Sequence, residues 1–368
     1  MLLTAFRVRA FGCVVDASVT LSPIHALIGP NDAGKSTLLR ALSMALESPN
    51  ERRPLRSGES VELVFENGVV VRADASGRNA SVGNEVIAAP DFIAACAAGH
   101  RLMRLNTALS NGGGVLRPGS VTLLAPPLAK KLESNGTATP LDQAGLDEAA
   151  AWIRHAPIYR LDPDSLRASS PLVATTDIRL QDPRGQGLAG VLDAIRDRDN
   201  SVWQEMEGCV RRFFPAVRQL RVSAVGNGHK EVSILLEDGT PVPAVDLSEG
   251  MLYVLGILAI VHSSPTSMVL LEEPENGLHP ARIRDVLALL RGLSTQVPVL
   301  MATHSPLVVN ELSEHEVTVV TRDAQGTHTR PLAETTDYAS RSRAYENGEL
   351  WLSYGDAEGE RGLVAEGE

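Results

Sequence analysis

A glycine-containing loop near the start of the chain has the residue types and spacing needed to bind phosphate. The segment Gly29-Pro-Asn-Asp-Ala-Gly34-Lys35-Ser36 fits the pattern GxxxxGK[ST]; it follows the apolar stretch Ala26–Ile28 and precedes a helical pattern. The backbone N–H groups of such a loop surround a nucleotide β-phosphate, and the following helix N-terminus adds positive partial charge. A chance glycine-rich turn is the alternative, and the flanking strand and helix disfavour it.

The side chains of this loop predict distinct roles. Lys35 is expected to reach the β- and γ-phosphate oxygens, and Ser36 is expected to offer its hydroxyl to Mg²⁺. The other residues expected to contact the phosphates are Gly29, Asn31, Asp32, Ala33, Gly34 and Thr37.

Two adjacent glutamates follow a short apolar run. Met268–Leu271 predicts a buried strand, and Glu272 and Glu273 emerge at its carboxyl end, where open parallel sheets bind ligands. Glu272 is expected to hold Mg²⁺, directly or through water, and Glu273 to polarise the attacking water. Adjacent side chains on a strand point to opposite faces, so we expect different roles. On its own, such a pair would more often be a solvated strand edge.

Two further polar segments flank this strand in the sequence. Leu247-Ser248-Glu249-Gly250 opens a predicted helix with Ser248 as its N-cap, and its place just before the acidic strand favours a function beyond capping. His304 follows the predicted strand Val297–Ala302 and can therefore reach the γ-phosphate. A lone histidine in that place would usually be structural.

Regular elements must position these residues. From residue 244 the pattern alternates helix, strand, helix and strand, which predicts a parallel sheet. Asn67-Gly68 predicts a hairpin turn, and Ser201 with Gln204 predicts a capping box at a helix start. The segments with these periodicities are Leu2–Val8, Val14–Leu21, Ile24–Ile28, Ser248–His262, Met268–Leu271, Ala281–Leu293 and Val297–Ala302.

In this order the four polar segments resemble the Walker A, signature, Walker B and switch-histidine motifs of ABC ATPases. Residues 271–280, LEEPENGLHP, and 302–305, ATHS, are similar to the RecF/SMC-related branch. They more closely resemble the AAA-family ATPases grouped with OLD proteins, often found in bacterial defence and repair operons. The resemblance implies an α/β P-loop NTPase fold of ABC type, with a nucleotide-binding lobe and a helical signature lobe that carries an inserted mixed α/β segment.

The resemblance also implies a homodimer with ATP and Mg²⁺ at its interface. Lys35, Glu273 and His304 would be catalytic, and Ser36 and Glu272 would hold the metal. The D-loop, residues 276–279, would face the partner. The residues expected to contact the γ-phosphate held by the other subunit are Ser248, Glu249 and Gly250.

The sequence departs from the wider ABC pattern at three places. Glu272 replaces the usual Walker B aspartate, and His279 replaces a D-loop aspartate. No glutamine follows the predicted strand at Tyr159, which leaves Gln181 as a weak Q-loop candidate. OLD nucleases add a Toprim domain, whereas the 64 residues after His304 (368 − 304) contain no DxD. We therefore expect a cutting or toxic activity on another chain, encoded nearby.

The leading functional hypothesis is a dimeric ATPase switch that senses or clamps DNA or RNA and controls an effector in defence or DNA repair. One alternative is the nucleotide-binding subunit of a transporter, disfavoured by the long interval from Thr37 to Leu247 and by Met251 in place of glutamine. The other is a scaffold that uses ATP with little turnover.

Composition limits these hypotheses. The net charge of −11 argues against a chain coated in nucleic acid, so salt-sensitive DNA or RNA binding is expected from the resemblance alone. The cysteines form no CxxC, which predicts reduced thiols and no zinc site. Arg7 and Arg9 disfavour a signal peptide, and the longest apolar run, Met251–Val261, is too short to span a bilayer. We expect a cytoplasmic protein with no membrane contact.

The expected domain organisation has four parts. Residues 1–75 form the first part of the ATPase lobe, and residues 76–243 form the insertion and second lobe. Residues 244–354 complete the ATPase core. The acidic, glycine-rich residues 355–368 are expected to be disordered.

Overall fold

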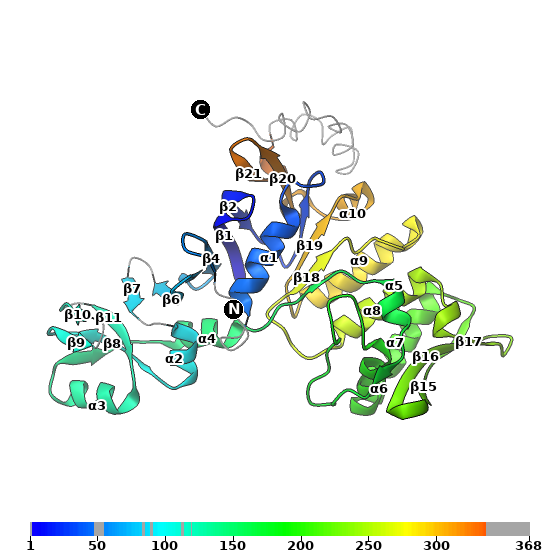
Figure 1. Ribbon diagram of the computed structural model, residues 1–368, viewed down its shortest axis with the longest axis horizontal. Coiled ribbons are helices and arrows are strands. Elements are labelled where there is room, and N and C mark those ends of the chain that lie inside the picture. Colours follow the sequence, from blue (N-terminus) through cyan, green and yellow to red (C-terminus); the bar gives the residue numbers. More distant parts are fainter. Residues whose placement is uncertain are drawn as a thin grey trace.

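The structure is a computed structural model that describes residues 2–47, 55–82, 85–88, 91–111, 114–118 and 120–335. It shows an α/β protein in which a central part is flanked by a mostly β wing and by a helical lobe (Figure 1). The expected disordered segment 355–368 lies outside the described residues.

The central sheet has six strands in the order β13-β18-β19-β3-β20-β21. Neighbours from β13 to β20 are parallel, and β21 is antiparallel to β20, which confirms the predicted parallel sheet. The strands are β13 (Ile158–Tyr159), β18 (Val269–Glu272), β19 (Val299–Thr303), β3 (Ile24–Ile28), β20 (Val317–Asp323) and β21 (Gly326–Pro331).

Apolar side chains alternate between two cores on either face of this sheet. In β18, Val269 and Leu271 pack with the helices of the lobe, whereas Leu270 packs with the helix that follows the phosphate-binding loop. β3 and β19 are buried along their whole length. The covering helices are α1 (Lys35–Leu46), α8 (Glu249–Val261), α9 (Pro280–Ser294) and α10 (Pro306–Asn310).

The wing grows from a nine-stranded sheet in the order β12-β8-β11-β7-β6-β5-β4-β1-β2. β4 and β5 form the predicted hairpin, and Gly68 at its turn has φ 78°. The sheet strands are β1 (Leu3–Phe11), β2 (Val14–Thr20), β4 (Ser60–Phe65), β5 (Val69–Asp74), β6 (Gly77–Val82), β7 (Glu85–Ala88), β8 (Arg101–Leu105), β11 (Val121–Leu124) and β12 (Ala138–Pro140). The remaining elements of the wing are β9 (Leu109–Asn111), β10 (Gly114–Leu116), α2 (Phe92–Ala97), α3 (Pro126–Ser134) and α4 (Ala144–Trp152).

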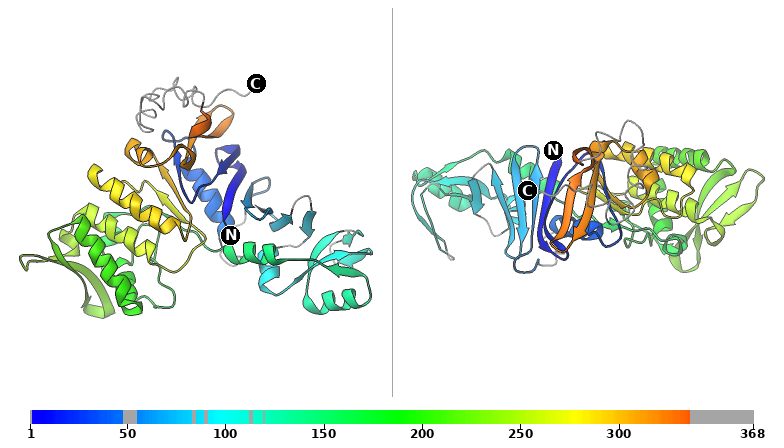
Figure 2. Two further views of the ribbon diagram at one scale, coloured as in Figure 1. Left: turned by 180° about the vertical axis from the view of Figure 1, so that it is seen from behind. Right: turned by 90° about the horizontal axis from the view of Figure 1, so that it is seen from above.

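The helical lobe lies on the opposite side of the central sheet from the wing (Figure 2). Its second long helix begins differently from our prediction, because Asp199 and not Ser201 is the N-cap. The Asp199 carboxylate accepts hydrogen bonds from the N–H groups of Ser201 and Val202 and takes the capping place. The elements are α5 (Pro163–Arg167), β14 (Ser170–Pro171), α6 (Leu188–Arg198), α7 (Asn200–Phe213), β15 (Val217–Val225), β16 (His229–Leu236) and β17 (Pro241–Pro243).

Within the described part of the chain, no helix combines the length and apolar character that a bilayer span requires.

Candidate functional site

The phosphate-binding loop joins buried β3 to α1, as predicted. Gly34 has φ 110°, and a Cβ atom there would lie 2.5 Å from Thr327 Oγ1, so this position requires glycine. A Cβ at Gly29 would lie 2.1 Å from the Val320 carbonyl oxygen. No side chain caps the N-terminus of α1. The first N–H groups of this helix are therefore available to a ligand.

A cavity of about 600 Å³ lies in front of this helix N-terminus. It contains both the loop side chains and the paired glutamates, which the sequence separates by more than 230 residues. The lining residues are Cys13, Asn31, Asp32, Gly34, Lys35, Ser36, Thr37, Arg40, Arg160, Glu272, Glu273, Ala302 and Arg322. Gly29 and Ala33 shape the loop without lining the cavity, and Ala33 is buried.

Charges of both signs line this cavity. Lys35, Arg40, Arg160 and Arg322 face three carboxylates, those of Asp32, Glu272 and Glu273. The Lys35 ammonium donates to the carbonyl oxygens of Gly29 at 2.6 Å and Pro30 at 2.7 Å. Such an arrangement suits a polyanion that arrives with a cation.

The two glutamates do not point to opposite faces as the sequence predicted. β18 ends at Glu272, and Glu273 has φ 50°, so the alternation of the strand stops between them. The backbone N–H of Glu273 still donates to the Ala302 carbonyl at 2.8 Å. Both carboxylates consequently line the same cavity.

The carboxylate of Glu273 is held by side chains from two neighbouring loops. Asn276 Nδ2 donates to Oε2 at 2.7 Å, and His304 Nδ1 lies 3.6 Å from Oε1. His304 thus meets Glu273 although it does not line the cavity itself. A non-glycine residue at positive φ is strained, and these contacts fix it in place.

Ser36 and Glu272 offer two oxygen donors on the wall of one cavity. Within the described residues, no group of three or more His, Cys, Asp or Glu side chains is arranged to hold a metal ion. Mg²⁺ prefers few protein oxygens completed by water and phosphate, so this pair fits it better than an all-protein cage would.

Arg160 is a cavity residue that our reading of the sequence missed. It directly follows β13, whose residues pair in parallel with Leu270 and Leu271 of β18. Its guanidinium lies 4.0 Å from Glu272 Oε2 and 3.4 Å from Glu273 Oε2. Gln181 does not line this cavity and lies instead in the wall of a neighbouring one that runs along α1.

The signature residues lie apart from the cavity. Ser248 is the N-cap of α8, as predicted, and its hydroxyl accepts a hydrogen bond from Met251 N at 3.3 Å. Ser248 and Glu249 are exposed, Gly250 is half-buried, and none of them lines the cavity. The structure therefore does not bring these residues to Lys35 within one chain.

The D-loop packs against α8. Gly277 has φ 70°, and a Cβ there would lie 2.3 Å from the ring of Tyr253. The Tyr253 hydroxyl in turn donates to the Leu161 carbonyl at 3.1 Å, next to Arg160. His279 caps α9, with Nδ1 accepting from Ala281 N at 3.2 Å. The D-loop, α8 and the segment after β13 are thus in direct contact.

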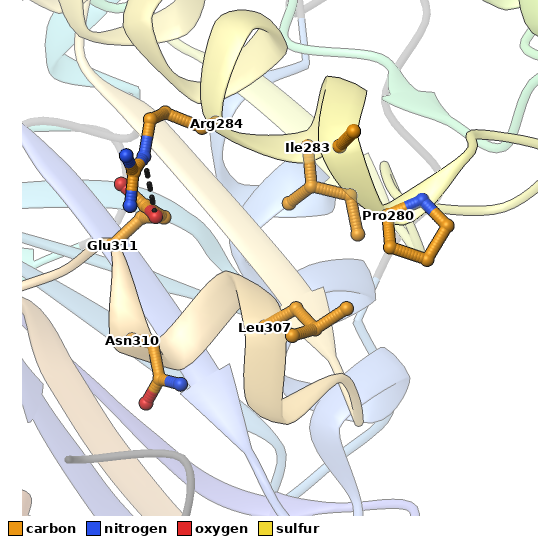
Figure 3. Close-up of a pocket in the computed structure, with 7 residues that line it drawn as sticks. Pro280, Ile283, Arg284, Leu307, Asn310 and Glu311 are labelled. Atoms are coloured by element: carbon orange, nitrogen blue, oxygen red, sulfur yellow. Dashed lines mark hydrogen bonds and ion pairs between the residues drawn. The ribbon is translucent and has the colours of Figure 1, made fainter.

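A second hollow, of about 370 Å³, lies between α9 and α10 (Figure 3). Arg284 Nε donates to Glu311 Oε1 at 2.9 Å across one end of it, and Leu307 and Ile283 form its apolar side. None of the site residues predicted from the sequence lines this hollow.

The family described as "AAA domain, putative AbiEii toxin, Type IV TA system" matches residues 24–79 and 132–310, more than half of the chain. The OLD nuclease of Thermus scotoductus (strain ATCC 700910 / SA-01) is 42% identical over 45 residues, which are 12% of this chain and 8% of that protein. The match thus spans less than a tenth of the nuclease.

SMC heads are among the solved structures that match this chain. An SMC head bound to the C-terminal winged-helix domain of ScpA is 12% identical with a TM-score of 0.54, covering 90% of this chain and 97% of that one. The SMC head of Thermotoga maritima is 14% identical with a TM-score of 0.44, covering 90% and 99%. The first of these shows the shared fold, that of a P-loop NTPase.

Proposed function

Since this chain belongs to the AAA-domain family described as putative AbiEii toxins, and is an ABC-type P-loop ATPase related to OLD proteins and SMC heads, we propose that it is a switch that closes as a homodimer around ATP. Hydrolysis reopens the dimer and changes the state of an effector protein on another chain. A role in bacterial defence or DNA repair is part of this proposal.

One observation carries the proposal. Lys35, Ser36, Glu272 and Glu273 line a single cavity, whereas Ser248, Glu249 and Gly250, the residues expected to donate to a γ-phosphate, do not line it. The exposed N-terminus of α8 at Ser248 offers such donors and lies elsewhere on the same chain. A second copy that presents its α8 to this cavity would complete the site.

The cavity residues fit the chemistry of phosphoryl transfer to water. Lys35 would exchange its loop carbonyls for phosphate oxygens, and Ser36 and Glu272 would hold Mg²⁺, which neutralises charge on the phosphates when bound. Glu273, held by Asn276 and flanked by His304, would accept a proton from the attacking water. His304 would contact the γ-phosphate from the same edge.

The division into an ATPase lobe (1–75 and 244–354) and an inserted segment with a second lobe (76–243) belongs to the same proposal. β13, from the second range, joins the central sheet and brings Arg160 to the cavity. Binding of DNA or RNA stays a prediction of the family resemblance, and mobility shifts at low and high salt would measure it.

Glu273→Gln tests the proposed switch. Glutamine keeps the size of the side chain but cannot take a proton, so turnover should fall about 100-fold or more while ATP stays bound. Light scattering should show a dimer with Mg²⁺-ATP and a monomer without it. Glu237→Gln, at an exposed position in the helical lobe, is the matched control and should behave as the wild type. A monomeric Glu273→Gln protein under both conditions, or one with wild-type turnover, would contradict the proposal.

A further inference from the structure

Arg160 contacts Glu272 and Glu273, and the proposed chemistry assigns no role to these contacts. Its side chain is 64% exposed, yet its guanidinium bridges the carboxylates of Glu272 and Glu273. These are the two groups assigned to the metal and to the attacking water. A guanidinium paired with both carboxylates competes with Mg²⁺ for Glu272 and with the attacking water for Glu273.

The backbone at Arg160 is held by hydrogen bonding and burial of the preceding residue, whereas most of its side chain is exposed. Its N–H donates to the Pro183 carbonyl at 3.0 Å, and the preceding residue, Tyr159, is buried in β13. Arginine has a long side chain with several rotatable bonds, so its guanidinium can reach other positions along the cavity wall while the backbone stays in place. Movement of this group requires no change in the sheet.

The other cations of the cavity have different partners. Lys35 donates to the Gly29 and Pro30 carbonyls, and Arg322 Nη1 donates to the Asp32 carbonyl at 3.4 Å. Arg40 donates to the Ser36 carbonyl and to Thr37 Oγ1 from its own helix. Arg160, in contrast, contacts both of the paired glutamates.

An arginine at this place cannot act as a metal ligand, because a guanidinium has five donors and no acceptor. It can bind two oxygens of one phosphate at once, and such paired, charge-assisted hydrogen bonds are stronger than those between neutral groups. A bound divalent cation at Glu272 would also repel it from that carboxylate. The terminal phosphate of a nucleoside triphosphate would therefore draw Arg160 away from the glutamates.

We propose that Arg160 is the group by which this site distinguishes ATP from ADP. Without nucleotide it pairs with Glu272 and Glu273 and keeps both from acting. With ATP it moves to the γ-phosphate, which frees Glu272 for Mg²⁺ and Glu273 for water. With ADP no phosphate lies within its reach, so the pairing persists. The inference rests on the proposed function, and it places the sensing of the γ-phosphate within one chain.

The test compares the affinities of ADP and a non-hydrolysable ATP analogue, both with Mg²⁺, by calorimetry. We expect the wild type to prefer the triphosphate and Arg160→Ala to lose about tenfold or more of that preference, with ADP affinity unchanged or higher. Arg160→Lys keeps the charge without the paired donors and should fall in between. Arg184→Ala is the matched control, because Arg184 is 66% exposed and pairs with Asp162 at 3.3 Å.

Three outcomes would overturn the inference. An equal change in both affinities would mean that Arg160 only supports the cavity, and no change would mean that it does not meet the phosphate. The same comparison in a Ser248→Arg background separates sensing within a chain from sensing across a dimer. Loss of preference only when Ser248 is intact would also contradict the inference. The proposed function fails separately, if the wild type binds neither nucleotide or Lys35→Ala binds both as the wild type does.

Discussion

Two regions of this chain differ in how many of their expected partners the chain itself provides: the phosphate-binding cavity and the N-terminus of α8. The cavity gathers residues from six separate stretches of sequence, and most of its charged groups already have partners. The N-terminus of α8 has one cap, Ser248, and exposed neighbours. One region is a nearly complete binding site, and the other is an exposed helix N-terminus.

This difference indicates how work is divided between two copies. Because the cavity is assembled within one chain, a monomer can bind nucleotide there. The N–H donors of α8 can contact only nucleotide that is bound to another subunit. Binding and turnover should therefore respond differently to changes in the two regions.

The largest effect should come from damaging each region in turn. Lys35→Ala removes a charge-assisted phosphate contact of about 1.5–3 kcal/mol and should abolish both binding and turnover at ordinary ATP concentrations. Ser248→Arg should abolish turnover and leave binding of ATP to the monomer nearly intact. ATP titrations and phosphate-release assays on each variant measure the two properties.

Mixing these two variants gives the decisive result for the comparison. Half of the dimers in an equal mixture pair one variant with the other, and each of these holds one intact composite site of two. Turnover should thus return to about a quarter of the wild-type value. A mixture as inactive as its components would show that the two regions serve the same chain.

A smaller effect is expected where the D-loop packs against α8. In Gly277→Ala a Cβ atom would meet the Tyr253 ring in a residue that also has φ 70°. We expect the free energy of unfolding to fall by about 1–3 kcal/mol. The control is Gly292→Ala in α9, where no atom lies within 4 Å of the added Cβ; it should be neutral or stabilising by about 0.5–1 kcal/mol. Urea denaturation of both variants compares them, and equal midpoints would disprove the close packing of D-loop and α8.

The smallest effect is the loss of folding stability at low pH that comes from His25 in β3, the strand before the phosphate-binding loop. Burial lowers the pKa of His25 in β3 to about 4, and its Nε2 lies 2.9 Å from Thr318 Oγ1. The unfolded chain takes up this proton near pH 6.5, so the contribution of neutral His25 is full above that pH and is lost as the pH falls toward 4. From pH 7 to 5.5 the loss should be about 1 kcal/mol. An NMR titration of the His25 imidazole measures its pKa in the folded protein, and a pKa above 6 would contradict the prediction.

The sequence could predict the phosphate-binding loop and the parallel sheet because both depend on short, local patterns. The GxxxxGKS spacing and the apolar run before Glu272 need no knowledge of distant contacts. The same is true of Ser248 as a cap, which the structure confirms. At the start of α7 the prediction of Ser201 as the cap was wrong, because the Asp199 carboxylate, two positions earlier, caps the helix.

Arg160 could not be found in this way. β13 has only two residues, and its partner strand lies 112 positions later, at Leu270 for Ile158. The sequence predicts a strand at Tyr159, but not that this strand pairs with β18 and so brings Arg160 to the glutamates. The joint orientation of Glu272 and Glu273 was also hidden, because it depends on a backbone φ of 50° that no pattern of residue types specifies.

The position of β3 in the middle of its sheet sets the order in which this protein can fold during synthesis. Its neighbours are β19 and β20, which the ribosome makes almost 300 residues after Ile24–Ile28. Thr327, whose hydroxyl donates a hydrogen bond to the Ala33 carbonyl in the phosphate-binding loop, is made later still. A nascent chain therefore exposes an apolar strand until β20 and Thr327 have emerged, and it cannot bind ATP before that point. An incomplete chain made by interrupted translation would thus carry the Walker A sequence without the site.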